Sequence, residues 1–169
     1  MLLQIGQLLV DVVAGFFVFL LLARFHFQWL RVPFRNPVGE FVVAATNWIV
    51  RPARKIIPPL AGLDLASLIA AWLVQALAPT LLLEMGGRAA SAMVLVDALF
   101  DLVRYSLYIL IFAVIVQAVL SWTNPYSPVQ PLFDALARPY LRPIRRFVPP
   151  LGNVDLSPLV LLVLLQVAL

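Results

Sequence analysis

Four apolar segments alternate with more polar connections along this chain of 169 residues. A helix needs about 20 apolar residues to cross the hydrocarbon core of a bilayer. The segments 2–22, 65–83 and 102–122 reach about that length, whereas the last, 156–169, has only 14 residues. The pattern predicts an all-α integral membrane protein with four transmembrane helices. For the last one, either the helix begins before Asp155 or the native chain continues past Leu169.

Two of the connections, 37–50 and 128–141, have the pattern of an amphipathic helix. Their apolar residues fall at the i, i+3, i+4, i+7 spacing of one helical face. These residues are Val38, Phe41, Val42, Ala45 and Ile49 in the first connection, and Val129, Leu132, Phe133, Leu136 and Tyr140 in the second. Both segments are too short, and too polar on the other face, to cross a membrane. We expect them to lie in the headgroup plane, with their basic ends near anionic lipid.

Local signals mark where these linker helices begin. In Asn36-Pro37 and Ser127-Pro128, a residue that can cap a helix precedes a proline suited to the first helical position. Ser127 and Gln130 together also fit a capping box, whereas Gly39 stands at the matching position of the first copy.

Prolines and aspartates mark the ends of the linkers. We expect Pro52 and Pro143 to disturb the helices and the proline pairs to end them. The pairs are Pro58-Pro59 and Pro149-Pro150. Asp64 and Asp155 precede the next apolar segments, where a carboxylate can accept hydrogen bonds from the free N–H groups of a helix start.

The two halves of the chain are copies of one unit. Residues 51–60 match residues 142–151 in their charges and prolines at an offset of 91, and no gap is needed between residues 37 and 75. Each copy holds two spans, an even number, so both copies cross the membrane in the same direction. The predicted organisation is a first repeat over 1–83, an outward-facing connection over 84–101 and a second repeat over 102–169.

Composition agrees with a membrane location. Hydrophobic residues make up 63% of the chain and charged residues 12%, where a soluble domain has about half and about a quarter. The net charge is +4, but the basic residues gather in the linkers, which favours anionic lipid over nucleic acid as the partner. The chain has no Cys, which excludes disulfides and thiolate metal sites.

The distribution of charge predicts orientation, because cytoplasmic loops carry an excess of Lys and Arg. The first linker region contains Arg24, Arg31, Arg35, Arg51, Arg54 and Lys55, and the second contains Arg138, Arg142, Arg145 and Arg146. The connection over 84–101 has Arg88 against Glu84, Asp97 and Asp101. Both linkers should therefore face the cytoplasm, and both termini should face outward.

The basic clusters are candidates for binding. Arg51, Arg54 and Lys55 recur at the same spacing as Arg142, Arg145 and Arg146. Topology alone would accept charges anywhere in the linker, whereas a fixed spacing suits anionic lipid or an acidic protein partner. Both explanations remain open at this stage.

A few polar residues lie inside the apolar segments, where they are costly and often functional. Asp11 could serve a proton or cation path, with Arg104 or Gln75 as partner, or could simply lie near the outer interface. Gln75, Gln117 and Gln166 are expected to form interhelical hydrogen bonds rather than line a pore. Asp101 and Arg104 could pair at i, i+3.

The sequence offers no catalytic, metal or cofactor site. His26 is the single histidine, and without Cys it cannot complete a typical metal or haem site. There is no His-Glu zinc pair, no Gly-x-Ser-x-Gly and no paired membrane carboxylates. We therefore predict that the protein is not an enzyme.

Three segments together carry a family resemblance. They are Ser121–Pro125, which includes Trp122 as an interfacial anchor, then Arg138–Pro150, and then Asp155–Pro158. This set resembles the signature of the YggT family, in two copies over nearly the whole chain. The first copy departs from it, with Ala66-Ser67 in place of Ser157-Pro158.

The resemblance implies a small protein of the bacterial inner membrane without an established enzymatic activity. It also implies several candidate roles, namely osmotic-stress tolerance linked to ion uptake, cell division or nucleoid organisation, and haem attachment in photosynthetic relatives. We expect a scaffold or assembly factor that works within a larger membrane complex or a homo-oligomer. The alternative is a small transport or channel-modulating protein.

Overall fold

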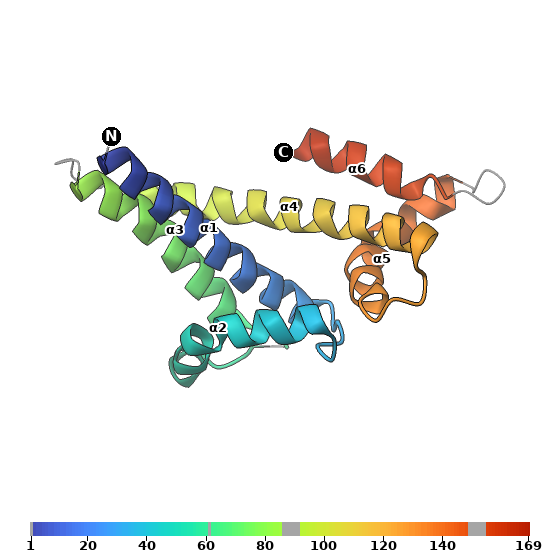
Figure 1. The fold of residues 1–169 in the computed structure, drawn as a ribbon, viewed down its shortest axis with the longest axis horizontal. Coiled ribbons are helices and arrows are strands. Elements are labelled where there is room, and N and C mark those ends of the chain that lie inside the picture. Colours follow the sequence, from blue (N-terminus) through green and yellow to red (C-terminus); the bar gives the residue numbers. More distant parts are fainter. Residues whose placement is uncertain (1, 61, 86–91, 149–154) are drawn as a thin grey trace.

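The computed structural model describes residues 2–60, 62–85, 92–148 and 155–169. These residues form six helices and no sheet, in two successive groups of three (Figure 1). The first group is α1 (Leu2–Trp29), α2 (Pro37–Ile56) and α3 (Leu65–Met85), and the second is α4 (Met93–Thr123), α5 (Gln130–Phe147) and α6 (Ser157–Ala168). The predicted all-α class is confirmed. In each group an amphipathic helix lies between two apolar helices.

The helices α1 and α3 pack side by side (Figure 1). Alanines of α3, including Ala66, Ala70 and Ala71, are buried in one cluster with Leu21 and Leu22 of α1. Small side chains let two helix backbones approach closely, which favours association within lipid. Larger apolar side chains such as those of Leu73, Leu77 and Leu81 point outward and are about half exposed. An apolar exterior of this kind suits lipid as the surrounding solvent.

In the second group α6 runs back along α4, and α5 packs against both helices (Figure 1). Val114, Ala137, Leu141, Leu161 and Leu165 form the core of this group. The long helix α4 also contacts α1 and α3 and thereby connects the two groups.

Within the described part of the chain, three helices are long and apolar enough to cross a membrane, over Gln4–Trp29, Leu65–Leu83 and Met93–Thr123. The helices that contain the predicted spans over 2–22 and 102–122 are longer than those segments. In the structure α1 continues to Trp29 and α4 begins at Met93, so the last part of the predicted 84–101 connection is helical. The fourth predicted span corresponds to α6, an apolar helix of only 12 residues.

Both linker helices are longer than predicted. They end at Ile56 and Phe147 rather than at 50 and 141, and they continue through Pro52 and Pro143. A proline inside a helix removes one backbone hydrogen bond, and that loss alone does not end these helices. The end comes at Ile57 and Val148, whose extended φ/ψ values of −115°/96° and −114°/93° are those favoured before a proline.

The two linker helices begin in different ways. At α2 the prediction is confirmed, because Asn36 Oδ1 accepts a hydrogen bond from the N–H of Gly39 at 2.9 Å. The capping box predicted at Ser127 is wrong, because α5 begins at Gln130 and its N-cap residue, Val129, makes no side-chain capping bond. The residues before α5 instead form backbone turns, in which Gln130 N–H donates to the carbonyl of Ser127 at 3.0 Å.

The start of α2 yields a prediction about Gly39. A Cβ at this position would lie 2.6 Å from the carbonyl oxygen of Phe34, a backbone atom that cannot easily move. We expect Gly39→Ala to destabilise the protein by about 1–3 kcal/mol, measured as thermal unfolding in detergent. Gly6→Ala is the matched control, because a Cβ there has no atom within 4 Å. Equal effects of the two substitutions would contradict this account.

Candidate functional site

The carboxylate of Asp64 is fully buried just before α3. Arg54, near the end of α2, donates from Nη2 to Asp64 Oδ2 at 2.6 Å and from Nε to Oδ1 at 3.2 Å. Ser67 Oγ also donates to Oδ2, at 2.6 Å, and a further bond joins Arg54 Nη2 to Gln28 Oε1 at 2.9 Å. A guanidinium that contacts both oxygens of a carboxylate forms a strong and directional pair. The pair ties the end of α2 to the start of α3.

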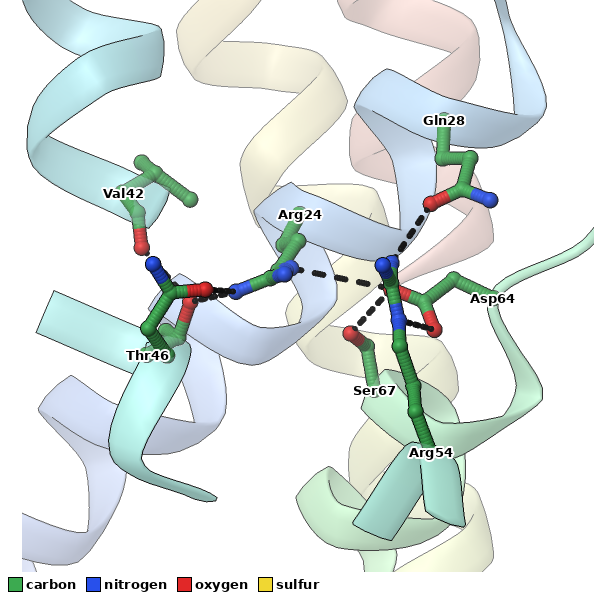
Figure 2. A network of polar contacts seen from close by, with 8 residues as sticks. Arg24, Gln28, Val42, Thr46, Arg54, Asp64 and Ser67 are labelled. Atoms are coloured by element: carbon green, nitrogen blue, oxygen red, sulfur yellow. Dashed lines mark hydrogen bonds and ion pairs between the residues drawn. The ribbon is translucent and has the colours of Figure 1, made fainter. Parts of the chain in front are cut away.

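Arg24 connects α1 to the same centre (Figure 2). Its side chain is buried, with Nε 3.6 Å from Asp64 Oδ2. On its other side Nη1 donates to Thr46 Oγ1 at 2.8 Å and to Asn47 Oδ1 at 3.0 Å. Thr46 in turn donates to the carbonyl of Val42 at 2.6 Å. The three helices of the first repeat therefore meet at one buried ionic network, which we call the clamp (Arg24, Thr46, Arg54, Asp64 and Ser67).

The clamp keeps Asp64 ionised. Burial by itself would raise the pKa of this carboxyl, but the hydrogen bonds from Arg54 and Ser67 and the charges of Arg54 and Arg24 outweigh it. The pKa of Asp64 therefore lies below its usual value. Two guanidinium groups surround one carboxylate, so the centre keeps a net positive charge.

The second repeat retains only part of the clamp. Arg145 Nε pairs with Asp155 Oδ2 at 2.8 Å, at positions equivalent to Arg54 and Asp64. Both side chains are partly exposed, at 47% and 34%. Asp155 Oδ1 also accepts from the N–H of Ser157 at 2.9 Å, as predicted for a carboxylate before a helix. The positions matching Arg24, Thr46 and Ser67 hold Ile115, Ala137 and Pro158 at the offset of 91.

A different polar contact joins the first helix of the second repeat to its linker. Gln117 of α4 is buried, and its Nε2 donates to Asp134 Oδ1 of α5 at 3.1 Å. The bond connects two neighbouring helices, which is the use expected for a glutamine within a span. The donor of this bond, Gln117, is neutral, whereas the residue that joins the first helix to its linker in the first repeat, Arg24, is charged.

The structure divides the predicted basic clusters into two kinds of residue. Arg54 and Arg145 are paired with the aspartates that follow them ten positions later. Arg51, Lys55, Arg142 and Arg146 are exposed, and no ion pair involves them among the described residues. The repeated spacing between Arg54 and Asp64 was the available signal for the pairs. Arg24 and Thr46 were missed, because no short motif connects them to Asp64.

The predicted polar residues of the spans do not gather at one place. Gln75 Nε2 donates to Asp101 Oδ2 at 2.9 Å, and Arg104 lies 3.7 Å from Asp101, so the i, i+3 pair is confirmed. The partners predicted for Asp11 were wrong, because both of those side chains are engaged with Asp101 instead. Asp11 and Gln166 are exposed on the outer surfaces of α1 and α6.

The remaining predicted residues lie at the ends of the helices. Trp122 is 70% exposed near the end of α4, and Pro125 is exposed in the turn that follows. Pro58 and Pro59 are exposed after α2, whereas Pro149 and Pro150 lie outside the described residues. The Nδ1 atom of His26 bonds within its own helix, to the carbonyl of Leu22 at 2.7 Å.

The two ion pairs of the repeats should differ greatly in energy. Asp64→Asn leaves Arg24 buried without its counter-charge, and breaking a buried pair from one side costs about 3–5 kcal/mol. Asp155→Asn is the matched control, because an exposed pair contributes only about 0–1 kcal/mol. Thermal unfolding of the two variants in detergent measures the difference. Similar losses in both variants would show that burial does not distinguish the pairs.

The stability of the protein at low pH should depend on the carboxylate of Asp64. Because the pKa of folded Asp64 lies below its unfolded value of about 3.9, its stabilising effect is complete above that value and is lost as pH falls through the folded pKa. The unfolding temperature of the unmodified protein should therefore fall more than that of Asp64→Asn between about pH 6 and about pH 2. Parallel curves would assign the acid sensitivity to other groups.

Comparisons with known proteins agree with the two-repeat organisation. The model of the CCB3/YggT family matches residues 3–85 and 96–169, one segment for each group of three helices. YggT of Escherichia coli strain K12 is 32% identical over 160 residues, which cover 94% of this chain and 84% of that protein. No solved structure matches the chain.

Two further relatives show the same degree of similarity. Protein PA0392 of Pseudomonas aeruginosa is 32% identical over 89% of this chain and 79% of its own. A protein encoded in the proC 3′ region of Vibrio alginolyticus is 32% identical over 95% and 89%. The names of these two relatives and of the Escherichia coli protein describe them as uncharacterized. With its two matched segments and these relatives along most of its length, the chain belongs to the CCB3/YggT family.

Proposed function

We propose that this protein is a non-enzymatic scaffold of the bacterial inner membrane, whose two linker helices lie on the cytoplasmic surface and bind anionic lipid headgroups. The termini then face outward, and the anchored linkers present a fixed surface to a larger membrane complex or to further copies of the chain. The proposal rests on one repeated surface feature at the ends of α2 and α5.

That feature is an exposed apolar tip beside exposed cations. Ile56 and Phe147 occupy equivalent positions in the two repeats and are 83% and 86% exposed. Arg51 and Lys55 are exposed close to Ile56 in sequence, and Arg142 and Arg146 are exposed close to Phe147. We call these two sets the linker tips. A large apolar side chain beside cations suits an anionic membrane surface, where the first enters the acyl boundary and the second contact phosphates.

The pairing of Arg54 and Arg145 supports this use of the remaining cations. Each pair fixes the end of its linker helix to the segment that leads into the next helix. The helix is thereby held with its buried face inward, which includes Val42 and Val50 in α2 and Leu136 and Leu141 in α5. The unpaired cations then remain on the outer side of each linker.

The transport alternative has less support. A permeation path needs several polar groups that converge. Among the described residues, Gln75 and Gln117 are occupied by interhelical hydrogen bonds, whereas Asp11 and Gln166 are exposed on the outside of the helices. This arrangement favours glutamines that hold helices together over a lined channel.

The linker tips can be tested with a single label on each, because the chain contains no Cys. Ile56→Cys or Phe147→Cys takes an environment-sensitive fluorophore, and the labelled protein is reconstituted with phosphatidylcholine alone or mixed with phosphatidylglycerol. We expect a blue shift of the emission with phosphatidylglycerol, because the tip enters the bilayer boundary. Charge reversal of the two neighbouring cations should abolish the shift, and salt should weaken it.

Two controls make the experiment specific. A label at Ile5→Cys, near the N-terminus of α1, should not respond to phosphatidylglycerol. Charge reversal at Arg142 and Arg146 should leave the response at Ile56 unchanged if each tip binds separately. A blue shift that survives the reversal of the neighbouring cations, with helical content intact, would overturn the assignment to lipid headgroups.

A further inference from the structure

A large, partly open cavity lies between the two repeats, and no residue of the linker tips belongs to its lining. Its walls come from the C-terminal end of α1, the first half of α3, the middle of α4, and from α5 and α6. Its volume is about 910 Å³, within the range of about 300–1,000 Å³ typical of small-molecule sites. Because both repeats contribute to its walls, it exists only when the two groups of helices are assembled.

The cavity is almost entirely apolar and has no charged side chain in its lining. Lys, Arg, Asp and Glu are all absent from the residues that form its wall. A phosphate group would therefore find no counter-charge there and would remain desolvated, which is costly. An apolar molecule with a neutral headgroup suits the cavity better than an anionic phospholipid does.

One wall carries a hydrogen-bond acceptor. The Nδ1 atom of His26 lies 2.7 Å from the carbonyl oxygen of Leu22, and since a carbonyl only accepts, Nδ1 carries the hydrogen. In the neutral ring Nε2 then has a lone pair, and the structure gives this atom no hydrogen-bond partner among the described residues. Ser106, also in the lining, already donates to the carbonyl of Leu102 at 2.8 Å.

Two aromatic rings of the same helix lie beside His26. The ring of His26 is 5.4 Å from that of Phe25 and 6.0 Å from that of Trp29, measured between centroids. Trp72 and Tyr140 belong to the same lining, from α3 and α5. Flat rings pack against aromatic side chains with a favourable geometry that a saturated chain does not reproduce.

We propose that this cavity binds an isoprenoid quinol. The quinol ring lies among the aromatic side chains, one of its hydroxyl groups donates to His26 Nε2, and the isoprenoid tail follows the apolar wall of α4. The assignment is one of binding only. It fits the three properties of the cavity together, since a quinol has a flat ring, a neutral hydroxyl donor and an apolar tail.

Tryptophan fluorescence provides the test. Trp48→Phe and Trp122→Phe remove the two tryptophans that do not line the cavity and leave Trp29 and Trp72, which do. In nanodiscs of this variant, decylubiquinol should quench the emission with saturation. Adding His26→Phe keeps a ring but removes the acceptor, and should weaken binding about threefold to tenfold, as expected for one hydrogen bond.

Two substitutions on α4 separate the cavity from the rest of the surface. Ser106→Phe places a large side chain in the cavity and should abolish saturable quenching. Val119→Phe on the same helix is the control, because Val119 is exposed and lies outside the lining. Circular dichroism checks that both variants keep their helices. If Ser106→Phe loses them, Leu107→Phe takes its place, because it narrows the same cavity without adding a tryptophan.

A competition experiment with brominated phospholipids tests whether the cavity holds a quinol or a lipid acyl chain. Phospholipids with brominated acyl chains also quench tryptophan. In nanodiscs of these lipids, saturating decylubiquinol should therefore add less quenching than in unbrominated lipids, because it displaces a quencher that is already in the cavity. If decylubiquinol neither saturates nor displaces the brominated chains, the occupant is an acyl chain and the quinol assignment is wrong. The same conclusion follows if His26→Phe leaves the affinity unchanged. Neither result bears on the linker tips, whose labels lie elsewhere.

Discussion

The buried carboxylate of Asp64 imposes the strictest constraint on this fold. An ionised group without contact with water is too costly to keep unless opposite charge and hydrogen bonds surround it. Arg54 and Ser67 supply three hydrogen bonds to it, and Arg24 adds a second positive charge. Because these side chains come from α1, α2 and the start of α3, the helices of the first repeat can satisfy Asp64 only in one mutual arrangement. The apolar surfaces of α1 and α3 are less selective, since many apolar faces could slide past each other in lipid.

The second repeat has the same order of helices, but its Arg–Asp pair is more exposed than that of the first repeat. The Arg145–Asp155 pair reproduces the position and the ten-residue spacing of the first pair, but it is partly open to solvent. Because Ile115 of α4 stands at the position that matches Arg24, the contact between the first helix and its linker falls to Gln117 and Asp134. The long α4 compensates in another way, because it packs against α1 and α3 as well as against α5 and α6. The first repeat is thus held by a buried ionic network, and the second is held mainly by apolar contacts.

This division bears on how the linkers could act at a membrane. One arginine in each linker forms an ion pair with an aspartate of the same chain, and two cations and a large apolar side chain remain exposed. The Arg–Asp pair of each linker sets which face of the helix points outward, and the residues of the linker tip are then available to contact the membrane surface. Lipid contact at the linker tips and ligand binding in the cavity would involve different residues, and they would share only the packing of the two repeats that α4 brings together.

The sequence by itself determined the helical class, the amphipathic linkers, the repeat and the proline stops. Each of these follows from local spacing, composition or steric restriction, and the two copies reinforce one another. It could not place the helix ends within the apolar runs, because nothing local stops α1 before Trp29 or delays α4 beyond Met93. It also could not show that Arg54 faces inward, that Arg24 and Thr46 complete the clamp, or that His26 opens onto a cavity. Those outcomes depend on which faces of separate helices meet, and only burial in the assembled structure decides which charges must find a partner.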